Sequence, residues 1–382
     1  MRLLKIGTLN IPRDRWQDAL DCFSQIDVFC FDTENEIENE KFRYYRFNTQ
    51  NKINNFLFRA TRHFSYDHNK KVLCNFCLIL LRIVNHKLLK KIKSTNYDYI
   101  HSSYNDFDES AFLTCLLDPK VYTRAQKETR LYYSFLEKKA LENASLIVLN
   151  DQYNLELYKR KYGDVFLENK KIRYSLDEDV RSKKLLSVIQ YSKKLSDDDG
   201  KVHAVILAGR VLSNPEDSRS GGRLYYISLI KSLVQNGIVV HLHTGNIVPY
   251  NGHDPYKELE KIETNFIIEG PLDFINDTIN AYKVLSRYDI GVCHAHLPNT
   301  EVTEFDKVNI PHRYYEYHLA HVVPFDLLGG NLLLEKKASE GYALIVDSYG
   351  EITLDKIKNI RWDTPTFSQY IKELYGNDSK GE

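Results

Sequence analysis

Short apolar runs alternate with longer amphipathic segments through the second half of the chain. The run HAVILA at 203–208 is followed by Gly209 and predicts a buried strand. Apolar residues then recur at helical spacing through 223–236, and Gly237 is placed to end that helix. Further strands are predicted at 238–243, 265–268, 289–293 and 343–347, with helices starting at Asp254-Pro255 and covering 273–288 and 310–320. This alternation is typical of repeated βαβ units and a parallel sheet covered on both faces.

The first half of the chain has the same alternation with longer helices. Strands are predicted at 3–9, 27–32, 97–102 and 146–150, helices at 15–25, 108–117 and 125–143, and a long amphipathic stretch at 70–93. The densest polar break is SDDDG at 196–200. The predicted fold class is therefore α/β, with two Rossmann-like, doubly wound parallel-sheet domains at residues 1–195 and 201–365. The remaining residues, 366–382, predict a C-terminal helix that crosses back to the first domain.

The composition of the chain excludes several classes of protein. The 52 basic and 52 acidic residues cancel, which excludes the whole-chain positive charge of nucleic-acid binders, so no nucleic-acid partner is expected. No apolar stretch has the length of a membrane span, and the first residues lack the apolar core of a signal peptide. Cys74 and Cys77 are the only close pair among six cysteines, and buried free thiols are favoured there over a zinc or redox site. These features predict a cytoplasmic protein.

Four local patterns, in their order and spacing, resemble those of one enzyme family. They are HAVILAGR at 203–210, YDIG at 288–291, IPHRYYEYHLAHVVPF at 310–325, and a helix–strand–helix segment at 135–163 that contains LIVLN. Together they resemble the large retaining group of GT-B glycosyltransferases (glycosyltransferase group 1, or family-4-like). The resemblance implies two domains facing each other across a cleft, with the acceptor on 1–195 and the donor on 201–365.

The same resemblance implies an activity. The protein is expected to move a sugar from a nucleotide-sugar donor to a glycan or lipid-linked acceptor, in surface polysaccharide or glycoconjugate biosynthesis, without a cofactor or metal. Val308 stands where the family often has a first glutamate, and the lysine that often follows the Gly-Arg loop has no clear match. Two alternatives therefore stay open: a sugar-nucleotide epimerase or phosphorylase on the same fold, and a non-catalytic nucleotide-sugar-binding relative.

Arginines near the end of the 203–208 strand are candidates for the donor diphosphate. Ligands of open α/β sheets bind at the carboxyl ends of strands, which is where Gly209 and Arg210 are expected. Arg219 and Arg223 flank Gly221-Gly222, a pair that would let backbone approach a phosphate. Guanidinium groups bind phosphate in a bidentate manner and do not lose their charge. The alternative is that these arginines are solvated loop charges.

Three further residues are donor-site candidates. The resemblance gives Glu316 the donor-binding role, as acceptor of the ribose hydroxyls, with Arg313 three residues before it; the alternative is an i,i+3 ion pair. His294 follows a predicted strand and, with His296, is interpreted as a diphosphate contact or a structural residue rather than a metal ligand.

His101 is the catalytic candidate in the first domain. It is expected at the end of the 97–102 strand, on the edge that faces the cleft. A general base at that place would serve an inverting enzyme, and a satisfied structural histidine is the alternative.

A basic amphipathic segment covers 62–93. It holds eight basic residues and one acidic residue, which gives 8 − 1 = +7 formal charges. Such a segment predicts that the protein makes peripheral contact with the inner face of an anionic membrane. A solvated helix face packed on its own domain is the alternative.

Overall fold

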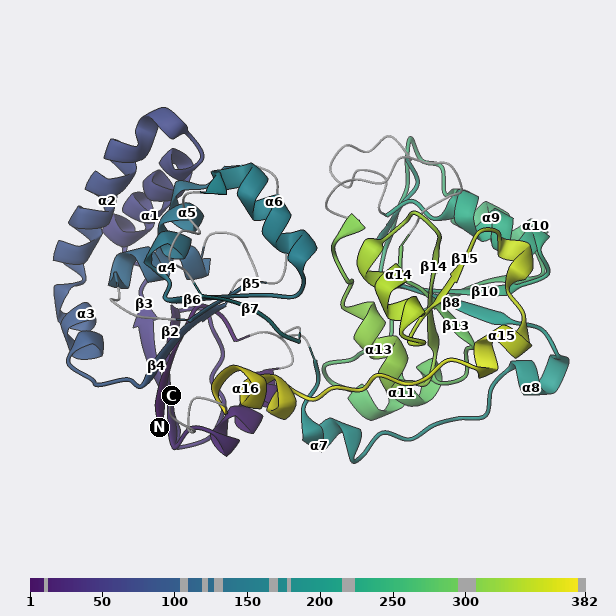
Figure 1. Ribbon diagram of the computed structural model, residues 1–382. Helices are drawn as coiled ribbons and strands as arrows, with labels where there is room; N and C mark the ends of the chain where they lie inside the picture. The colour runs from purple at the N-terminus through teal and green to yellow at the C-terminus, as the bar shows by residue number, and fades with distance from the viewer. Residues whose placement is uncertain are drawn as a thin grey trace. The chain divides into compact units, whose positions relative to one another are not determined.

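The chain folds into two compact units that share one architecture. The computed structural model describes residues 1–9, 13–103, 109–118, 123–126, 133–164, 171–176, 180–214, 224–294 and 307–376. Unit 1 comprises Met1–Lys183 together with the C-terminal segment from Pro365, and unit 2 comprises Lys184–Thr364. Each unit holds a parallel sheet with helices on both faces (Figure 1). The predicted α/β class with two Rossmann-like domains is confirmed.

The sheet of unit 1 has seven parallel strands in the order β3-β2-β1-β4-β5-β6-β7. Its strands are β1 (Arg2–Ile6), β2 (Gln25–Phe31), β3 (Phe42–Phe47), β4 (Tyr99–Ser103), β5 (Thr123–Gln126), β6 (Leu146–Leu149) and β7 (Lys171–Tyr174). Its helices are η1 (Arg13–Asp21), α1 (Lys52–Ser65), η2 (His68–Lys70), α2 (Lys71–Val84), α3 (His86–Lys93), α4 (Glu109–Leu117), α5 (Phe135–Asn143), α6 (Gln152–Tyr162) and α16 (Phe367–Tyr375). The central strands β1 and β2 are buried along almost their whole length because helices cover both faces of the sheet.

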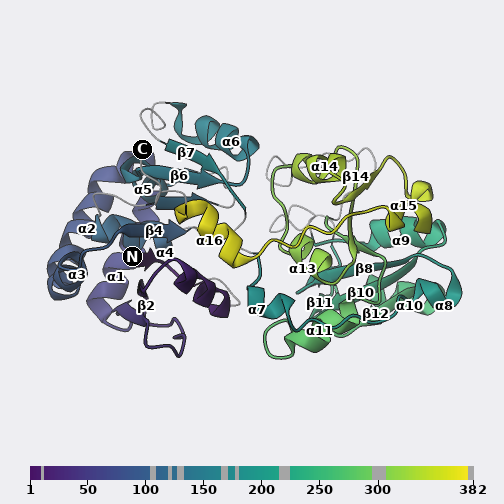
Figure 2. The ribbon, with the colours of Figure 1, turned by 60° about the horizontal axis from the view of Figure 1, so that its bottom comes forward.

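The C-terminal helix α16 packs within unit 1. It begins at a capping box in which Thr366 and Gln369 satisfy each other's backbone N–H groups. The Phe367 ring meets the Trp16 ring of η1 edge-on, with centroids 4.9 Å apart. Arg173 on β7 donates to the Leu374 carbonyl at 2.8 Å. Figure 2 shows α16 beside the purple helix η1.

The sheet of unit 2 has six parallel strands in the order β12-β10-β8-β13-β14-β15, and β9 pairs with β11 in a separate two-stranded sheet. The strands are β8 (His203–Ala208), β9 (Val211–Leu212), β10 (Val239–Thr244), β11 (Ile247–Val248), β12 (Phe266–Glu269), β13 (Ile290–Val292), β14 (Val323–Leu327) and β15 (Leu344–Val346). The helices are α7 (Lys183–Leu186), α8 (Ser196–Asp199), α9 (Ile227–Gln235), α10 (Pro255–Ile262), α11 (Thr278–Leu285), α13 (Arg313–Leu319), α14 (Leu332–Ser339), η4 (Tyr349–Glu351) and α15 (Leu354–Lys358). Both sheets follow the Rossmann order.

The polar segment at 196–200, where the sequence placed the domain boundary, belongs to unit 2. Lys194 donates to the carbonyl oxygens of Tyr288 and His321, and Ser196 donates to Asp289 at 2.6 Å. Burial lowers the pKa of Lys194 to about 8. Asp197 and Asp198 are exposed, and the 196–200 segment therefore has the polar character of a linker. The hydrogen bonds of Lys194 and Ser196 nevertheless attach it to unit 2.

The two close cysteines of the sequence lie on α2, within the long amphipathic stretch. Cys74 and Cys77 are free and buried, and burial raises the pKa of the Cys74 thiol to about 12. Over the described residues, no single helix has both the length and the apolar character needed to cross a bilayer. The 68–84 and 86–93 helical segments reach that threshold only as a pair, and they are bent by 82°.

Candidate functional site

The strand order of unit 2 defines a switch point between β8 and β13. From β8 the chain proceeds outward to β10 and β12, and then returns to add β13, β14 and β15 on the other side of β8. The connections on the two sides of such a point diverge, which opens a crevice at the carboxyl ends of the two strands where α/β proteins bind ligands. Gly209 and Arg210 follow β8 at this edge, and His294 follows β13. Three of the predicted donor residues are therefore brought to one place.

Gly209 and Arg210 are both exposed at the end of β8. A Cβ built on Gly209 meets no heavy atom of the described residues within 4 Å, so the fold itself leaves space there. The next strand end lies close, since a Cβ on Gly245 would stand 3.1 Å from the Gly209 carbonyl oxygen. The result is a narrow glycine-lined edge with one exposed guanidinium, which suits a phosphate group better than a bulky apolar ligand.

His294 is held by an acidic partner on the neighbouring strand. Its Nδ1 lies 2.9 Å from Asp326 Oδ2, and both side chains are buried. The other carboxylate oxygen of Asp326 accepts the backbone N–H of Leu327 at 2.8 Å. An ionised carboxylate only accepts hydrogen bonds, so Nδ1 of His294 is the donor to Asp326. Asp326 was not among the residues predicted from the sequence, because it lies inside the apolar strand β14 rather than after it.

The helix α13 holds Arg313 and Glu316, and tyrosines from neighbouring helices bind both. Arg313 donates to the hydroxyl of Tyr226, at the start of α9, at 3.0 Å. Glu316 is buried and accepts a hydrogen bond from Tyr282 on α11. Arg313 thus joins α13 to the start of α9, while Glu316, one turn further along α13, joins it to α11. The expected ribose role of Glu316 stays a prediction.

A single packing contact explains why the YDIG and YYEY patterns occur together. Tyr317 of α13 is fully buried, and its ring lies directly on the backbone of β13. A Cβ on Gly291 would stand 2.5 Å from three atoms of that ring. The Tyr317 hydroxyl donates to the Val292 carbonyl at 3.1 Å. Gly291 is therefore required for α13, with Arg313 and Glu316, to reach the sheet.

Arg219 and Arg223 lie outside the described residues, as do the Gly221-Gly222 pair and His296. The structure does show another glycine pair at this edge, Gly329-Gly330, between β14 and α14. Gly329 has a φ of +80°, and its N–H is bound by Glu335 at 2.7 Å. Asn331 caps α14 through the Leu334 N–H.

His101 does not lie at a strand end, contrary to the expectation. β4 continues to Ser103, so His101 lies inside the strand and is fully buried. Its Nδ1 is hydrogen-bonded to the hydroxyl of Tyr375 on α16, and its ring meets Trp16 edge-on at 5.8 Å. Helices η1 and α16 cover the face of the sheet on which His101 lies. A structural histidine therefore fits its surroundings better than a general base does.

Unit 1 has its own switch point, between β1 and β4. Gly7 follows β1 with a φ of +92°, and a Cβ there would stand 2.6 Å from Ser110 Cβ on α4. Only glycine allows this approach, which brings the first turn of α4 to the end of β1.

Unit 2 also contains a buried titratable network apart from this edge. His203 Nδ1 and His241 Nε2 lie 3.0 Å apart, and His241 Nδ1 lies 2.7 Å from Glu269. Tyr288 donates to Glu269 at 2.9 Å and lies 2.8 Å from His243 Nε2. The hydrogen bond from His241 is the largest cause that lowers the pKa of Glu269 from 4.5 to about 2. No group of three or more His, Cys, Asp or Glu side chains in the described ranges has the arrangement of a metal site.

This lowered pKa predicts an acid-sensitive contribution to stability. A carboxylate with a depressed native pKa stabilises the fold above its unfolded pKa and loses that effect as pH falls through the native value. We expect Glu269→Gln to lower the free energy of unfolding by about 1–2 kcal/mol at pH 7, after allowance for partial solvent screening. The difference in the free energy of unfolding between the variant and the wild type should shrink between pH 4.5 and 2, the range between the ordinary and the lowered pKa of Glu269. Urea unfolding of the wild type and Glu269→Gln across this pH range measures the difference, with the exposed Glu40→Gln as control. A loss of stability in Glu269→Gln that does not change with pH would contradict the prediction.

The comparisons with known proteins concern the fold. No family model matches this sequence, and no curated protein matches it. A solved UDP-N-acetylglucosamine 2-epimerase is similar with a TM-score of 0.51 at 11% identity, covering 100% of this chain and 97% of its own. The UDP-GlcNAc 2-epimerase of Methanocaldococcus jannaschii gives 0.49 at 11% identity, covering all of both chains. HepE of Anabaena, solved with UDP, gives 0.47 at 14% identity, covering 99% of this chain and 95% of its own. The first of these similarities, together with the two strand orders, shows the fold: two Rossmann-like domains of the GT-B type.

Proposed function

We propose that this chain is a glycosyltransferase that binds a nucleotide-sugar donor on unit 2, at the β8/β13 edge. The observation that carries the proposal is the meeting, at one switch point, of the exposed Arg210 with the His294–Asp326 pair. The sequence predicts Arg210 at a strand end and His294 as a diphosphate contact or a structural residue, and the similar epimerase is, by its name, an enzyme of a nucleotide sugar.

The proposed chemistry follows from the charge that develops when the sugar leaves. Breaking the bond to the anomeric carbon places negative charge on the diphosphate, and fixed positive groups stabilise it. Arg210 supplies an always-charged guanidinium there, and Arg219 and Arg223 are the further sequence candidates. His294, whose ring is oriented by the Nδ1 hydrogen bond to Asp326, is a further candidate for a contact with the diphosphate at the same edge. We propose that the reaction needs no metal and no cofactor, and that the acceptor is a glycan or a lipid-linked sugar.

Ligand binding by the wild-type protein tests the donor part of the proposal. Diphosphates of uridine, guanosine, adenosine and thymidine, and the matching nucleosides, are compared by thermal unfolding in the presence of EDTA. One diphosphate should stabilise the protein, because a ligand at 100 times its Kd adds about 2.7 kcal/mol to the folded state. No shift with any diphosphate would contradict the proposal.

Turnover then separates the transferase from its two alternatives. The nucleotide sugar selected by binding is incubated with and without candidate acceptors, and release of the nucleoside diphosphate is followed. A transferase releases it faster when the acceptor is present. Isomerisation of the sugar without an acceptor would identify an epimerase, and binding without either reaction would identify a non-catalytic relative.

A further inference from the structure

The helices α1 and α2 of unit 1 expose an unusual amount of apolar surface. Of the twenty large hydrophobic side chains that are exposed among the described residues, nine lie between positions 53 and 84. Four of them recur at helical spacing along α2, and their exposed fractions are 79% for Val72, 56% for Phe76, 50% for Ile79 and 66% for Ile83. On α1, Ile53 and Phe56 are also exposed, Phe56 at 71%. Contiguous apolar surface of this kind marks an interaction site.

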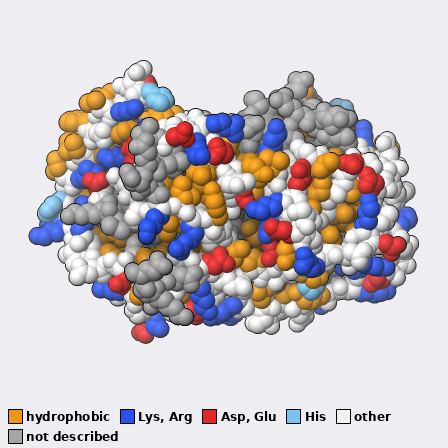
Figure 3. Space-filling model, viewed as in Figure 1, with side chains coloured by type: hydrophobic (Ala, Val, Ile, Leu, Met, Phe, Trp, Pro, Cys, Tyr) orange, Lys and Arg blue, Asp and Glu red, His pale blue; other side chains and the backbone are white. Residues whose placement is uncertain are grey.

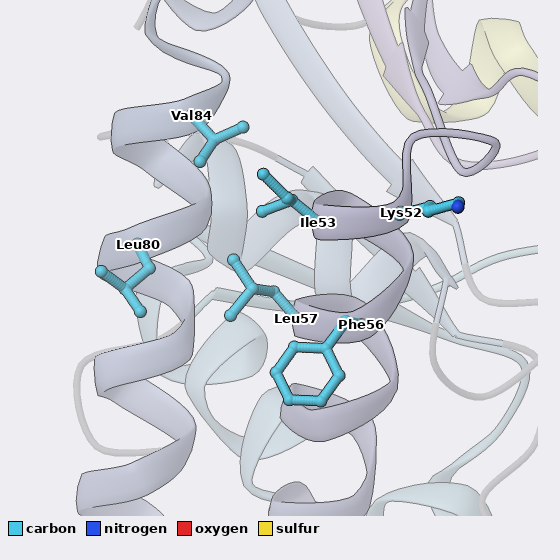
Figure 4. A pocket seen from close by; sticks show the side chains of 6 residues that line it. All are labelled: Lys52, Ile53, Phe56, Leu57, Leu80 and Val84. Atoms are coloured by element: carbon cyan, nitrogen blue, oxygen red, sulfur yellow. The ribbon is translucent and has the colours of Figure 1, made fainter.

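The fold does not use this stripe. The opposite side of α2 supplies the core, where Cys74, Leu78 and Leu81 are buried. Between α1 and α2 lies a groove of about 380 Å³, lined by Lys52, Ile53, Phe56, Leu57, Leu80 and Val84. Figure 4 shows Ile53 and Leu57 of α1 pointing toward α2, with Lys52 pointing away. In Figure 3 hydrophobic side chains gather at the edge of unit 1 where Figure 1 places α2. We call the exposed residues of α1 and α2, with this groove, the apolar face.

Positive charge surrounds the apolar face. Residues 52–93 contain ten Lys and Arg and one acidic residue, 10 − 1 = +9, in a chain whose total charge is zero. The one acid, Asp67, pairs with Lys70 at 3.1 Å and caps η2. Arg82 turns inward instead, donating to the carbonyls of Cys115 and Leu116.

The cations lie at both ends of the apolar face. Lys52 stands at the groove near Val84, and Lys70 and Lys71 lie at the other end, where α2 begins. Beyond Val84, α3 turns by 82° from α2 and exposes Lys87, Lys90, Lys91 and Lys93. The apolar residues Leu89 and Ile92 of α3 are buried in the core. So α3 can offer charge to a surface but no apolar stripe, which corrects the simple amphipathic reading of 62–93.

We propose that the apolar face docks on an anionic lipid bilayer, with α1 and α2 lying in the interfacial plane. Apolar side chains enter the boundary between headgroups and acyl chains, while the lysines at the ends of the face meet anionic headgroups. Charge complementarity selects this occupant. A second copy of the chain would bring +9 against +9 across a symmetric contact, which costs free energy. The proposal does not depend on the activity proposed for unit 2.

Flotation of the full-length protein with vesicles tests the docking. Vesicles of phosphatidylcholine alone are compared with vesicles that also contain phosphatidylglycerol, at low and physiological ionic strength. The protein should float only with the anionic vesicles, and less as salt rises, because screening shortens to about 8 Å near physiological ionic strength. A protein that stays in solution with anionic vesicles at low salt would overturn the proposal.

Two variants separate the apolar and electrostatic contributions. Replacing Val72, Phe76 and Ile83 with Gln should weaken binding about 10-fold or more. Replacing Lys87, Lys90 and Lys93 with Gln should weaken it about 100-fold at low salt, since each lysine near the surface contributes about a 5-fold factor. Lys91 is left in place because its ammonium lies over the Tyr45 ring, 5.6 Å from the centroid.

A matched control uses exposed apolar residues of unit 2. Replacing Ile262, Ile275 and Ile279 with Gln removes similar side chains from another surface and should leave flotation unchanged. Circular dichroism melting curves check that every variant is folded. If the apolar-face variant floats like the wild type, or if its only effect is to dissociate a dimer, the face does not dock on lipid.

Discussion

Gly291→Ala is expected to destabilise the protein by about 3 kcal/mol, at the upper end of the cost of overpacking a core. The added methyl would stand 2.5 Å from three ring atoms of Tyr317. The ring has no room to retreat, because Tyr317 is fully buried between α13 and the sheet and its hydroxyl is bound to the Val292 carbonyl at 3.1 Å. Either β13 or α13 has to shift. Denaturant unfolding of the full chain measures the loss.

The chain offers a matched control and a compensating change. Gly209→Ala introduces the same methyl just after β8 in the same unit, where it meets no heavy atom of the described residues within 4 Å, so the free energy of unfolding should be almost unaffected. Tyr317→Leu, made together with Gly291→Ala, removes the opposing ring and should make the two effects clearly non-additive. Gly291→Ala with the stability of the wild type would show that Tyr317 does not pack as described.

Elements that are buried on both faces were predictable from the sequence. The run at 203–208 was predicted as a strand and is β8, with the same bounds. A parallel strand between two helix layers is mostly apolar, so it stands out against its polar connections. The alternation of such runs with amphipathic segments was sufficient for the α/β class.

Strands that depart from this pattern were missed. β3 at the sheet edge has the sequence FRYYRF, in which buried aromatic residues alternate with arginines. β7, KIRY, has no fully buried side chain. β14 carries Pro324 in an interior position opposite Gly291, where a residue without an N–H argues against a strand. Residues 125–126 were predicted as the start of a helix and belong to β5 (Thr123–Gln126). In each case tertiary context outweighed the local signal.

The site was predictable only where one residue marks a strand end. Arg210 follows a clear strand and a glycine, so its exposure at the carboxyl edge could be foreseen. Asp326 meets His294 because β13 and β14 are parallel neighbours with Val292 opposite Phe325, a register that no sequence spacing reveals. His101 shows the opposite error, since it was expected at the end of a strand and is the third of the five residues of β4.

The second large effect concerns the diphosphate. Arg210 is exposed, so Arg210→Ala should leave the fold intact while it removes a charge-assisted contact. Such a contact to phosphate contributes roughly 1.5–3 kcal/mol, which corresponds to a loss of about 10- to 150-fold in affinity. A nucleoside without phosphates makes no such contact, and its affinity should change little.

The measurement that tests the central claim most directly is calorimetric titration of wild type and Arg210→Ala with one nucleoside diphosphate and its nucleoside. The exposed Lys231→Ala on α9 serves as a control for loss of one positive charge from unit 2. We expect the diphosphate to lose about 10-fold or more in Arg210→Ala alone, with the nucleoside unchanged. Equal losses for both ligands, or an unchanged diphosphate affinity, would contradict a diphosphate site at the β8/β13 edge.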